Sequence, residues 1–565
     1  MDMDRAPYRG KFTPIQEDIV PYHGKFALNR CKFASYWMEI PLHRGKRAVH
    51  GGDDVRRGDD VPLCATSRLP PGEDARFQAA IHPQEAHETA AAHAVLCTRV
   101  MRHQLLVAAA APLLFALAAC GGSASSSGTS NPSNPADPPS VPVAKSTLAR
   151  DSAASISPTV LAGAVTANNA FALDLYSRVR TTPTPSNVLT SPLSASLALT
   201  MTYAGAVGDT ATQMASALHY GAAAPSIFDG QNALSQALAS RAAKALAGDT
   251  QIASESNEPA PSSSDYQLQV VNSVWGEQTY TWNAPFLDTL AKSYGTGVYQ
   301  EDFLTNFDQA RQTINTWVSD ATVDKINNLL PVGSLDDTTR MVLVNAVHLK
   351  FPWANTFSVG ATANASFTKS DATTVSAPFM NQTQTYAYVD DGNAQIVSLP
   401  LSGGQISVVI ALPHGDLATY EAGLAVGAAA IAQPTAQALV QLSLPKVAFT
   451  SPTFSLRTAL MAMGMNDPFD GETADFTGLC THPPDGDRLY IKDVLQKAMI
   501  AMQETGVEAA AATAVIMAGT AGESAPPVIV PMVVNRPFLL SIIDVPTGAV
   551  LFLGHIEDPT AAGSP

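Results

Sequence analysis

Histidine is the side chain best suited to acid–base catalysis near neutral pH. The C-terminal half of the chain has four, none inside a catalytic motif: His348, His414, His482 and His555. The chain has no GxSxG nucleophile motif, no P-loop and no dinucleotide-binding fingerprint. The stretch HETAAAH (87–93) lacks the HExxH spacing, which places two zinc ligands on one helical face. We therefore predict no enzyme, no cofactor and no metal site, and we expect these histidines to be structural or exposed.

Cys120 is the residue whose surroundings indicate a specific chemical modification. An arginine and an apolar run from Leu105 to Ala119 precede it, and two glycines follow it. The run is too short for a membrane span but has the length of a signal-peptide core. Residues 101–119 resemble a bacterial lipoprotein signal peptide, which is cut before the cysteine so that Cys120 carries lipid. The alternative is a short buried helix, but the Ser- and Pro-rich stretch that follows favours the lipidated form.

A signal peptide lies at the N-terminus of a chain, whereas this one begins at Met101. We expect translation to start there and residues 1–100 to be an over-called extension; a cytosolic pre-domain is the alternative. The full sequence contains five cysteines, namely Cys31, Cys64, Cys97, Cys120 and Cys480. Without the first hundred residues, and with Cys120 lipidated, only Cys480 is left. We therefore predict no intramolecular disulfide, even in an oxidising compartment.

Residues 120–158 are rich in Ser, Pro and Gly and predict a flexible linker between the lipid and a folded domain. Such a linker spans roughly 100 Å when extended, at about 3.3 Å per residue. Gly121 stands where an Asp typically retains lipoproteins at the inner membrane. The sequence thus predicts an outer-membrane lipoprotein of the bacterial cell envelope, and it leaves open whether the domain faces the periplasm or the cell exterior.

The chain as a whole has the composition of a globular protein. Of its 565 residues, 46% are hydrophobic and 15% are charged, and the formal net charge is −16. An acidic chain without a long basic run argues against nucleic acid as a partner. The sequence has no internal repeat, and we predict one domain over residues 159–558, followed by a tail at 559–565.

Helical patterns dominate the first part of this domain, and strand patterns dominate the last part. Apolar periodicity predicts helices at 168–179, after Ser191–Pro192, and at 308–320; Ser191 is a suitable N-cap. The insertion SESNEPAPSSSD (254–265) predicts a surface loop. Strand patterns occur at 266–277, 341–353, 405–413, 440–449, 493–504 and on both sides of the turn at 546–548. This order predicts an α+β fold with a large, mainly antiparallel sheet.

One stretch near the C-terminus fits neither a helical nor a strand period. Residues 504–517 read ETGVEAAAATAVIM, in which the alanines favour helix and the β-branched residues favour strand. A predicted strand precedes the stretch, and the Gly- and Pro-rich residues 518–531 follow it. The pattern predicts a strand that runs out into a long exposed loop of small residues. Such a loop either can slide between two existing strands or is an ordinary protease-sensitive loop.

Several motifs along the domain resemble the serpin family, in the order in which that family has them. ETGVEAAAATAV (504–515) resembles the hinge and reactive loop of inhibitory serpins, and VVNRPFLLSI (533–542) resembles the C-terminal signature. Further family segments are matched by TSPLS (190–194), INTWV (314–318), LVNAVHLKFPW (343–353), SLPKV (443–447) and ADFTG (474–478). Because many independent motifs occur in the right order, the resemblance is specific.

The resemblance implies the serpin fold, in which helices surround a large central sheet and a reactive loop is exposed. It also implies a suicide inhibitor of serine proteases. The protease attacks the loop and forms an acyl-enzyme, and the cut loop then inserts as a new strand in the central sheet and carries the protease with it. The expected partner is therefore one target protease in a 1:1 covalent complex with a monomeric inhibitor.

Counting from Glu504 by the family's spacing places the cleaved bond at Thr520–Ala521. The loop is longer than is typical, which makes Met517–Ala518 the runner-up. The residues around both bonds are small or apolar and uncharged, so elastase-like or subtilisin-like proteases are expected targets rather than proteases that select Arg or Lys. Inhibition of papain-like cysteine proteases by the same loop is a weaker alternative.

The resemblance assigns a hinge to the start of this loop, namely Glu504, Gly506, Val507, Glu508, Ala509, Ala510, Ala511, Ala512 and Thr513. Side chains alternate between the two faces of a strand. The inward-facing positions of an inserted loop are therefore Val507, Ala509, Ala511, Thr513 and Val515, all uncharged, and Glu508 is expected to point outward to solvent. Non-inhibitory serpins often carry charges or prolines at such positions. The hinge therefore favours an inhibitor over the alternative of a non-inhibitory serpin-fold binding protein.

The resemblance also implies an ion pair. Lys446 and Glu504 correspond to a family salt bridge near Trp353, at the end of the sheet that the family calls the breach. The alternative is two solvated charges worth at most about 1 kcal/mol.

A second group of polar residues corresponds to the region where the family's sheet opens. Ser191 lies in that region, and Ser194 and Asn345 match a buried hydrogen-bonded cluster. Gln496 replaces the family's frequent histidine in this cluster. Because an amide both donates and accepts hydrogen bonds, the cluster can persist without the pH dependence of an imidazole. Asp324 replaces a glycine that is common after the overlying helix, and the sequence supports no functional conclusion from this change.

Overall fold

The structure is a computed structural model that describes residues 141–180, 187–221, 224–424, 433–480, 488–508 and 528–562. These residues belong to one compact unit. Several predictions concern other parts of the chain and therefore lie outside the described residues. These are the extension 1–100, the signal peptide 101–119, Cys120, His482, and the loop residues Ala509 to Pro527 with both proposed cleavage sites.

Helices come mostly from the first half of the unit, as the sequence predicts. They are α2 (Pro158–Val179), α3 (Pro192–Tyr203), α4 (Gly208–Ala217), α5 (Ala224–Ala239), α6 (Arg241–Ser256), α7 (Ala284–Tyr294), α8 (Phe307–Ala321), α9 (Leu417–Ala422) and α10 (Arg457–Ala462). Pro192 takes the first position of α3, but Ser191 does not cap that helix with its side chain. Its hydroxyl donates instead to Leu551 O at 2.9 Å, because α3 begins against the C-terminal strand that contains Leu551. Helix α6 continues to Ser256, inside the predicted loop, and ends at Asn257 in the left-handed conformation.

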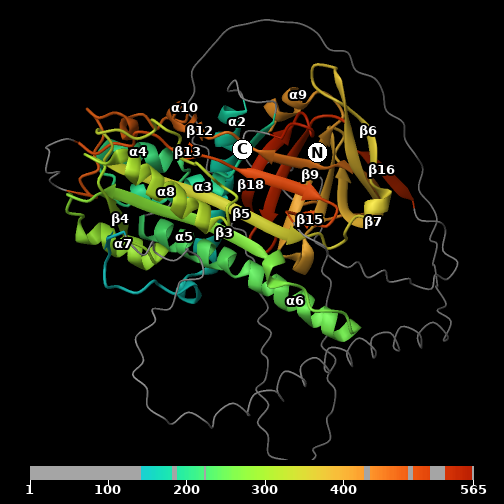
Figure 1. Ribbon diagram of the computed structural model, residues 1–565, viewed down its shortest axis with the longest axis horizontal. Helices are drawn as coiled ribbons and strands as arrows, with labels where there is room; N and C mark the ends of the chain where they lie inside the picture. Colours follow the sequence, from blue (N-terminus) through green and yellow to red (C-terminus); the bar gives the residue numbers. More distant parts are fainter. Residues whose placement is uncertain are drawn as a thin grey trace, which may run out of the picture. The chain divides into compact units, whose positions relative to one another are not determined.

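A seven-stranded sheet runs through the helical half of the unit (Figure 1). Its strands, in spatial order, are β1 (Val143–Ala144), β4 (Val298–Glu301), β3 (Gln267–Glu277), β5 (Met341–Pro352), β15 (Gly506–Val507), β14 (Met499–Gln503) and β11 (Val447–Thr450). The described ladders of this sheet are antiparallel except for β3 with β4.

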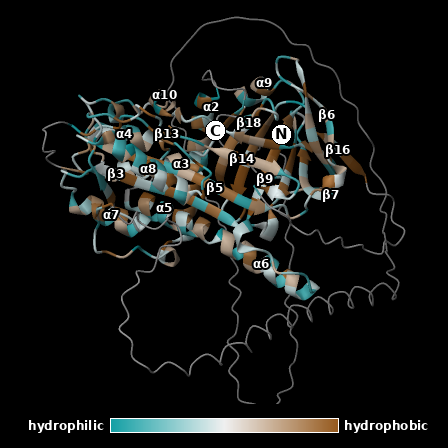
Figure 2. Cartoon of the chain, viewed as in Figure 1, coloured by the Kyte–Doolittle hydropathy of each residue, from teal (hydrophilic) through white to brown (hydrophobic). Residues whose placement is uncertain are grey.

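A nine-stranded sheet forms the other half. Its main path is β16 (Ile529–Val533), β10 (Gln437–Pro445), β7 (Thr374–Asp390), β8 (Ala394–Pro400), β9 (Ile406–Pro413), β17 (Phe538–Asp544), β18 (Ala549–Ile556) and β2 (Val188–Thr190), with β6 (Ala363–Thr368) paired to β7. A short third sheet pairs β12 (Phe454–Ser455) with β13 (Leu495–Gln496). The strands around β9 are strongly hydrophobic along their length (Figure 2), because they are buried on both faces.

Two predicted strands are each divided in the structure. The stretch 440–449 changes sheets at Lys446: β10 ends at Pro445 in the nine-stranded sheet, and β11 begins at Val447 in the seven-stranded sheet. The stretch 493–504 likewise separates into β13 and β14. The apolar residues of both stretches predict extended backbone. They do not predict which strand pairs with the first half of a stretch and which pairs with the second half.

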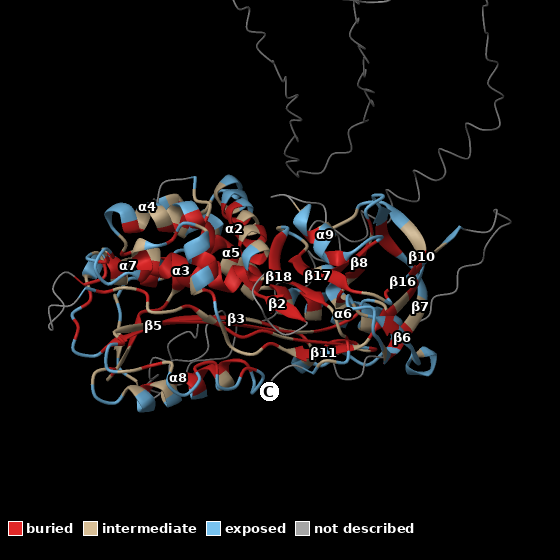
Figure 3. Ribbon diagram, turned by 90° about the horizontal axis from the view of Figure 1, so that it is seen from above, coloured by how far each residue is buried: buried red, intermediate tan, exposed pale blue. Residues whose placement is uncertain are grey.

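Helices lie on both faces of the seven-stranded sheet: α3 on one, and α8 over the end of the other that contains β3, β4 and β5 (Figure 3). One face contacts α3 and the main hydrophobic core, and the other face contacts α8 through a separate cluster. Three aromatic rings hold α8 on the sheet: Trp317 of α8 lies 5.7 Å from Trp275 and 5.8 Å from Tyr299, measured between ring centroids. The face under α8 is therefore not open to solvent.

The last residues of the predicted linker are folded, so the boundary at 158 is too late. Strand β1 adds an edge to the seven-stranded sheet by pairing with β4. The Arg150 side chain then donates to Asn232 Oδ1 at 2.9 Å and to Ser235 Oγ at 2.5 Å, both on α5. A strand of two residues is too short to show a period in the sequence. Strand β1 forms because β4 supplies its pairing partners.

Candidate functional site

The start of the predicted hinge already forms part of the seven-stranded sheet. Strand β15 lies between β5 and β14: Val507 pairs with Phe351 on one side and with Met502 on the other, and Gly506 pairs with Pro352 and Gln503. Within the described ranges β5 and β14 have no ladder with each other and are joined through β15. We call the boundary between β5 and β14 beyond Val507 the seam, since it is where a further strand would be added.

The two residues after Gly506 face opposite sides of the sheet. Val507 is 2% exposed and belongs to the main core, which agrees with the inward-facing position predicted for it. Glu508 faces the other side, as strand alternation requires, but the prediction that it points to solvent is wrong. Its side chain is only 7% exposed, and it contacts His348 on β5 and Lys325 in residues 322–340, which connect α8 to β5.

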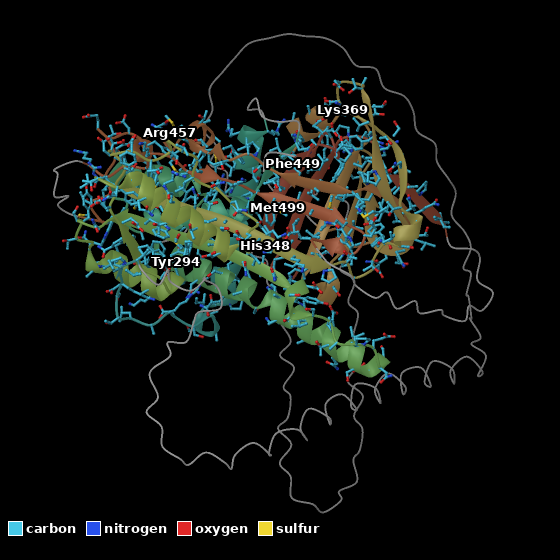
Figure 4. All side chains as sticks on the ribbon, viewed as in Figure 1. Tyr294, His348, Lys369, Phe449, Arg457 and Met499 are labelled. Carbon is cyan, nitrogen blue, oxygen red and sulfur yellow. The ribbon has the colours of Figure 1, made fainter. Side chains whose placement is uncertain are left out.

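Glu508 is held by two basic side chains. Its Oε2 lies 2.5 Å from Nε2 of His348, and its Oε1 lies 3.1 Å from Lys325 Nζ, in the α8–β5 connection. Figure 4 labels His348 on β5. Burial alone raises the pKa of the Glu508 carboxyl, but the hydrogen bond and charge of His348, together with Lys325, outweigh burial and leave its pKa below the ordinary value. The carboxylate is therefore the stable form at neutral pH.

The structure brings Lys446 and Glu504 together. Lys446 Nζ lies 2.8 Å from Glu504 Oε2, and Thr362 Oγ1 donates to Glu504 Oε1 at 2.9 Å. Burial tends to raise the pKa of Glu504, but the hydrogen bonds from Lys446 and Thr362 lower it by more, so its pKa lies below the ordinary value. The Glu504 side chain is 10% exposed, so the pair is mostly buried rather than two solvated charges.

Trp353 fixes the backbone beside this ion pair. Its indole N–H donates to Gln503 O at 2.7 Å, and its own backbone N–H donates to Thr505 O at 3.0 Å. It also forms an isolated bridge with Leu401, next to the nine-stranded sheet. The predicted group of Trp353, Lys446 and Glu504 thus connects the hinge to the point where the two sheets meet.

Gln496 occupies the predicted cluster and uses both ends of its amide. Its Nε2 donates to Ser191 O at 2.9 Å, and its Oε1 accepts from Ser191 N at 3.2 Å. Gln496 Nε2 also lies 3.5 Å from Asn345 Oδ1. An amide thus links β13, the start of α3 and β5, in the way its donor and acceptor capacity predicts.

Ser194 and Asn345, predicted to belong to this cluster, are linked through Asn272. Ser194 Oγ lies 3.5 Å from Asn272 Oδ1, and Asn272 on β3 is the register partner of Asn345 on β5. Asn345 Nδ2 is buried and has no hydrogen-bond partner among the described residues. Asn272 therefore separates the two predicted residues, and sequence spacing could not show this because the pairing of β3 with β5 is a long-range contact.

The α8–β5 connection is tied to both sides of the seam. Lys325 contacts Glu508, and Lys497, which follows β13, donates to Asn327 O at 3.0 Å. Further along, Lys492 Nζ lies 2.5 Å from Asp336 Oδ2. Asp324 has a φ of 59°, a conformation that glycine adopts more readily, which explains why a glycine is the common residue there.

Sequence reasoning missed His348, Lys325, Asn272 and Lys497. His348 was expected to be structural or exposed; it is buried, and it contacts the hinge. The signal that could have found it is alternation along β5, which places His348 on the same face as Val344 and Ala346, under α8. Three other histidines also have acidic partners: His219 contacts Asp174, His414 contacts Asp390, and His555 contacts Glu421.

The described residues contain no set of three or more His, Cys, Asp or Glu side chains arranged to hold a metal ion. In the same ranges, no helix has both the length and the apolar character needed to cross a bilayer.

Comparison with known proteins supplies the family. The sequence model of the family described as serpin (serine protease inhibitor) matches residues 166–559. Human plasminogen activator inhibitor 2 is 30% identical over 420 residues, which cover 70% of this chain and 99% of that protein. Human leukocyte elastase inhibitor is 30% identical over 414 residues, which cover 70% of this chain and 98% of that protein.

Solved structures agree with this fold. Tengpin, a thermophilic serpin in its native state, gives a TM-score of 0.60 at 24% identity, covering 74% of this chain and 99% of tengpin. Human thyroxine-binding globulin in complex with its ligand gives a TM-score of 0.58 at 28% identity, covering 71% of this chain and all of that one. With its two large sheets and these matches over most of its length, the chain belongs to the serpin family.

Proposed function

We propose that this serpin is a suicide inhibitor of serine endopeptidases, which acts by loop cleavage and by insertion of the cut loop into the seam. The observation that carries the proposal is β15. Its two residues pair with β5 and with β14 at once, so the chain that leads into the loop enters the sheet at the position where an added strand would continue.

The composition of the loop supports insertion. Continuing the alternation from buried Val507, the positions that would face the core are Ala509, Ala511, Thr513 and Val515, and none is charged. Adding about a dozen residues as a strand forms a dozen or more hydrogen bonds at about 0.5–1.5 kcal/mol net each. The total, on the order of 10 kcal/mol, is enough to distort a bound protease by breaking several of its own contacts.

The proposed target class follows from the loop residues at the expected cleavage site. Thr520 and Ala521, like Met517 and Ala518 at the alternative site, are uncharged, which suits the S1 pocket of an elastase-like or subtilisin-like protease. The match to a protein named leukocyte elastase inhibitor is consistent with this class. The match to thyroxine-binding globulin keeps a small-molecule binding protein as the competing outcome.

The test is to mix the protein with pancreatic elastase and with subtilisin and to analyse the products on a denaturing gel. We expect a covalent 1:1 band at the summed mass, and sequencing of the released peptide identifies the cleaved bond. Cleavage without a covalent band, and without a gain in thermal stability of the cleaved protein, would favour the binding protein instead. The same gel with papain tests the cysteine-protease alternative.

We further propose that the inhibitor is anchored in the bacterial outer membrane by lipid on Cys120. This proposal rests on the apolar run 105–119 and on the cysteine that ends it. Labelling cells with a radioactive fatty acid tests it: we expect the label on the wild-type chain and none on the Cys120→Ser variant. A labelled variant would contradict the proposal.

A further inference from the structure

The proposed loop insertion does not explain why the charged side chain of Glu508 is buried. It is the last described residue before the loop, and strand alternation requires only that it avoid the core face. Instead its carboxylate is enclosed by His348 on the neighbouring strand and by Lys325 in the α8–β5 connection. The last charged residue of the hinge is therefore held by ion pairs next to the sheet that the loop must enter.

The backbone of Glu508 turns the chain out of the sheet. Its N–H still donates to Ala501 O at 2.6 Å, which extends the pairing with β14 by one residue. Its φ is 54°, in the left-handed region that non-glycine residues seldom adopt. A strand needs φ near −120°, so Glu508 must change conformation before the residues after it can continue β15.

The register shows that the contact with His348 belongs to the turned-out conformation. Gly506 pairs with Pro352 and Val507 with Phe351. Continued into the loop, this antiparallel register places Glu508 opposite Lys350 and Ala510 opposite His348, and opposite residues share a face. In an inserted strand a methyl group, rather than the Glu508 carboxylate, would therefore be the direct neighbour of His348.

The surroundings of the contact are otherwise poor in charge. On β5, Lys350 is held by Asp265 at 2.8 Å. On β3, the residue opposite His348 is the neutral Gln269. Lys325 is 42% exposed, so its attraction is weakened by solvent, whereas the His348 side chain is 5% exposed. The contact with His348 is thus the main one that must break before Glu508 can take a strand conformation.

We infer that Glu508 is a positioning residue that delays loop insertion: bound by His348 and Lys325, it holds the hinge in its turned-out conformation and ties it to the α8–β5 connection. The inference rests on the proposed function, since it concerns the rate of the insertion step. The contact keeps the intact loop available to a protease, and its release frees both the hinge and the connection that crosses the seam.

The test measures insertion without a protease. The full chain is incubated with a synthetic peptide of sequence GVEAAAATAVIMAGT, which corresponds to residues 506–520 and must displace β15 and Glu508 to fill the seam, and conversion to the peptide-filled form is followed by native gel. Glu508→Gln is expected to convert faster by roughly tenfold to a hundredfold. This is the rate ratio that corresponds to losing one hydrogen bond to a charged group. His348→Gln is expected to behave similarly, and Lys325→Met to have a smaller effect. Exposed Glu472→Gln is the matched control.

Two comparisons separate a positioning role from a general structural one. The double variant with both Glu508→Gln and His348→Gln should convert no faster than the faster single variant, because both remove one contact. The peptide-filled forms of wild type and Glu508→Gln should unfold at the same urea concentration, because the contact is absent from that form. Equal conversion rates, or equal destabilisation of both forms, would overturn the inference.

Two outcomes distinguish a failure of this inference from a failure of the proposed function. If wild type forms the covalent protease complex but Glu508→Gln converts no faster, the inference fails and the proposed function stands. If neither protein takes up the peptide and neither forms the complex, the seam does not open, and both fail.

Discussion

Lys446 Nζ lies 2.8 Å from Glu504 Oε2, at the residue where one chain segment leaves the nine-stranded sheet and enters the seven-stranded sheet. The Glu504→Gln variant is expected to lower the free energy of unfolding by about 1–3 kcal/mol, because a mostly buried charged hydrogen bond is lost. Urea unfolding measures the change, with Glu472→Gln as the control. A loss no larger than that of the control would mean that the pair is two independent charges.

The pH dependence of this pair has a defined direction. The folded-state pKa of Glu504 is lowered from its ordinary value of 4.5. The stabilisation is therefore complete above about pH 4.5 and is lost as the pH falls through the lowered folded value. We expect the difference in unfolding free energy between wild type and Glu504→Gln to be constant from pH 7 to about 5. It should shrink at more acidic pH, and a difference that grows on acidification would contradict the assignment.

Gln496 is expected to be sensitive to loss of its amide. Gln496→Met has a similar volume but leaves Ser191 N and O unpaired, at about 1–3 kcal/mol for each buried group. Gln496→His should keep part of the network and make stability depend on pH near 6.5, the ordinary value of imidazole. Thermal unfolding at pH 5.5 and 7.5 distinguishes them: the histidine variant should differ between the two conditions by more than wild type does.

Val507 tests whether the hinge must remain apolar. The side chain is 2% exposed, so Val507→Arg places a charge against the core, at a cost of several kcal/mol. We expect elastase still to cut the loop of this variant, while the yield of covalent complex falls more than about tenfold. Val507→Thr is the matched control and should retain most of the yield. An unchanged yield for the arginine variant would show that the hinge does not insert.

The folded end of the linker is expected to stabilise the domain. A chain that begins at residue 157 lacks β1 and the Arg150 contacts with α5, whereas one that begins at residue 140 keeps both. We expect the free energy of unfolding of the shorter chain to be lower by about 2–4 kcal/mol, since hydrogen bonds of a charged group contribute about 1.5–3 kcal/mol each. Arg150→Met in the longer chain isolates that residue's share. Equal stability of all three proteins would mean that the segment only rests on the surface.

Much of the fold could be predicted because its elements have strong local patterns. Helix α8 and the strands β5, β9, β17 and β18 lie where their periodicity places them. The alternation after Gly506 also predicted the buried face of Val507. These features depend on period alone, which a sequence displays directly.

The errors concern what lies next to each element. Alternation assigns Glu508 to a face but does not show that His348 and Lys325 contact it there. Spacing suggests that Ser194 and Asn345 belong to one cluster but cannot show that Asn272 lies between them. The division at Lys446 depends on which sheet offers a free edge to each half of the segment. All three are decided by contacts between distant parts of the chain.

Strand β15 has a kinetic consequence. A new strand normally needs a nucleus, in which loop-closure entropy is lost before pairing compensates for it. Here the pairs made by Gly506 and Val507 with both neighbours exist in the intact protein, so that nucleus is already present. Insertion of the loop would then be elongation of an existing strand, one residue after another. The first residue to be added is Glu508, and its change of conformation would limit the rate.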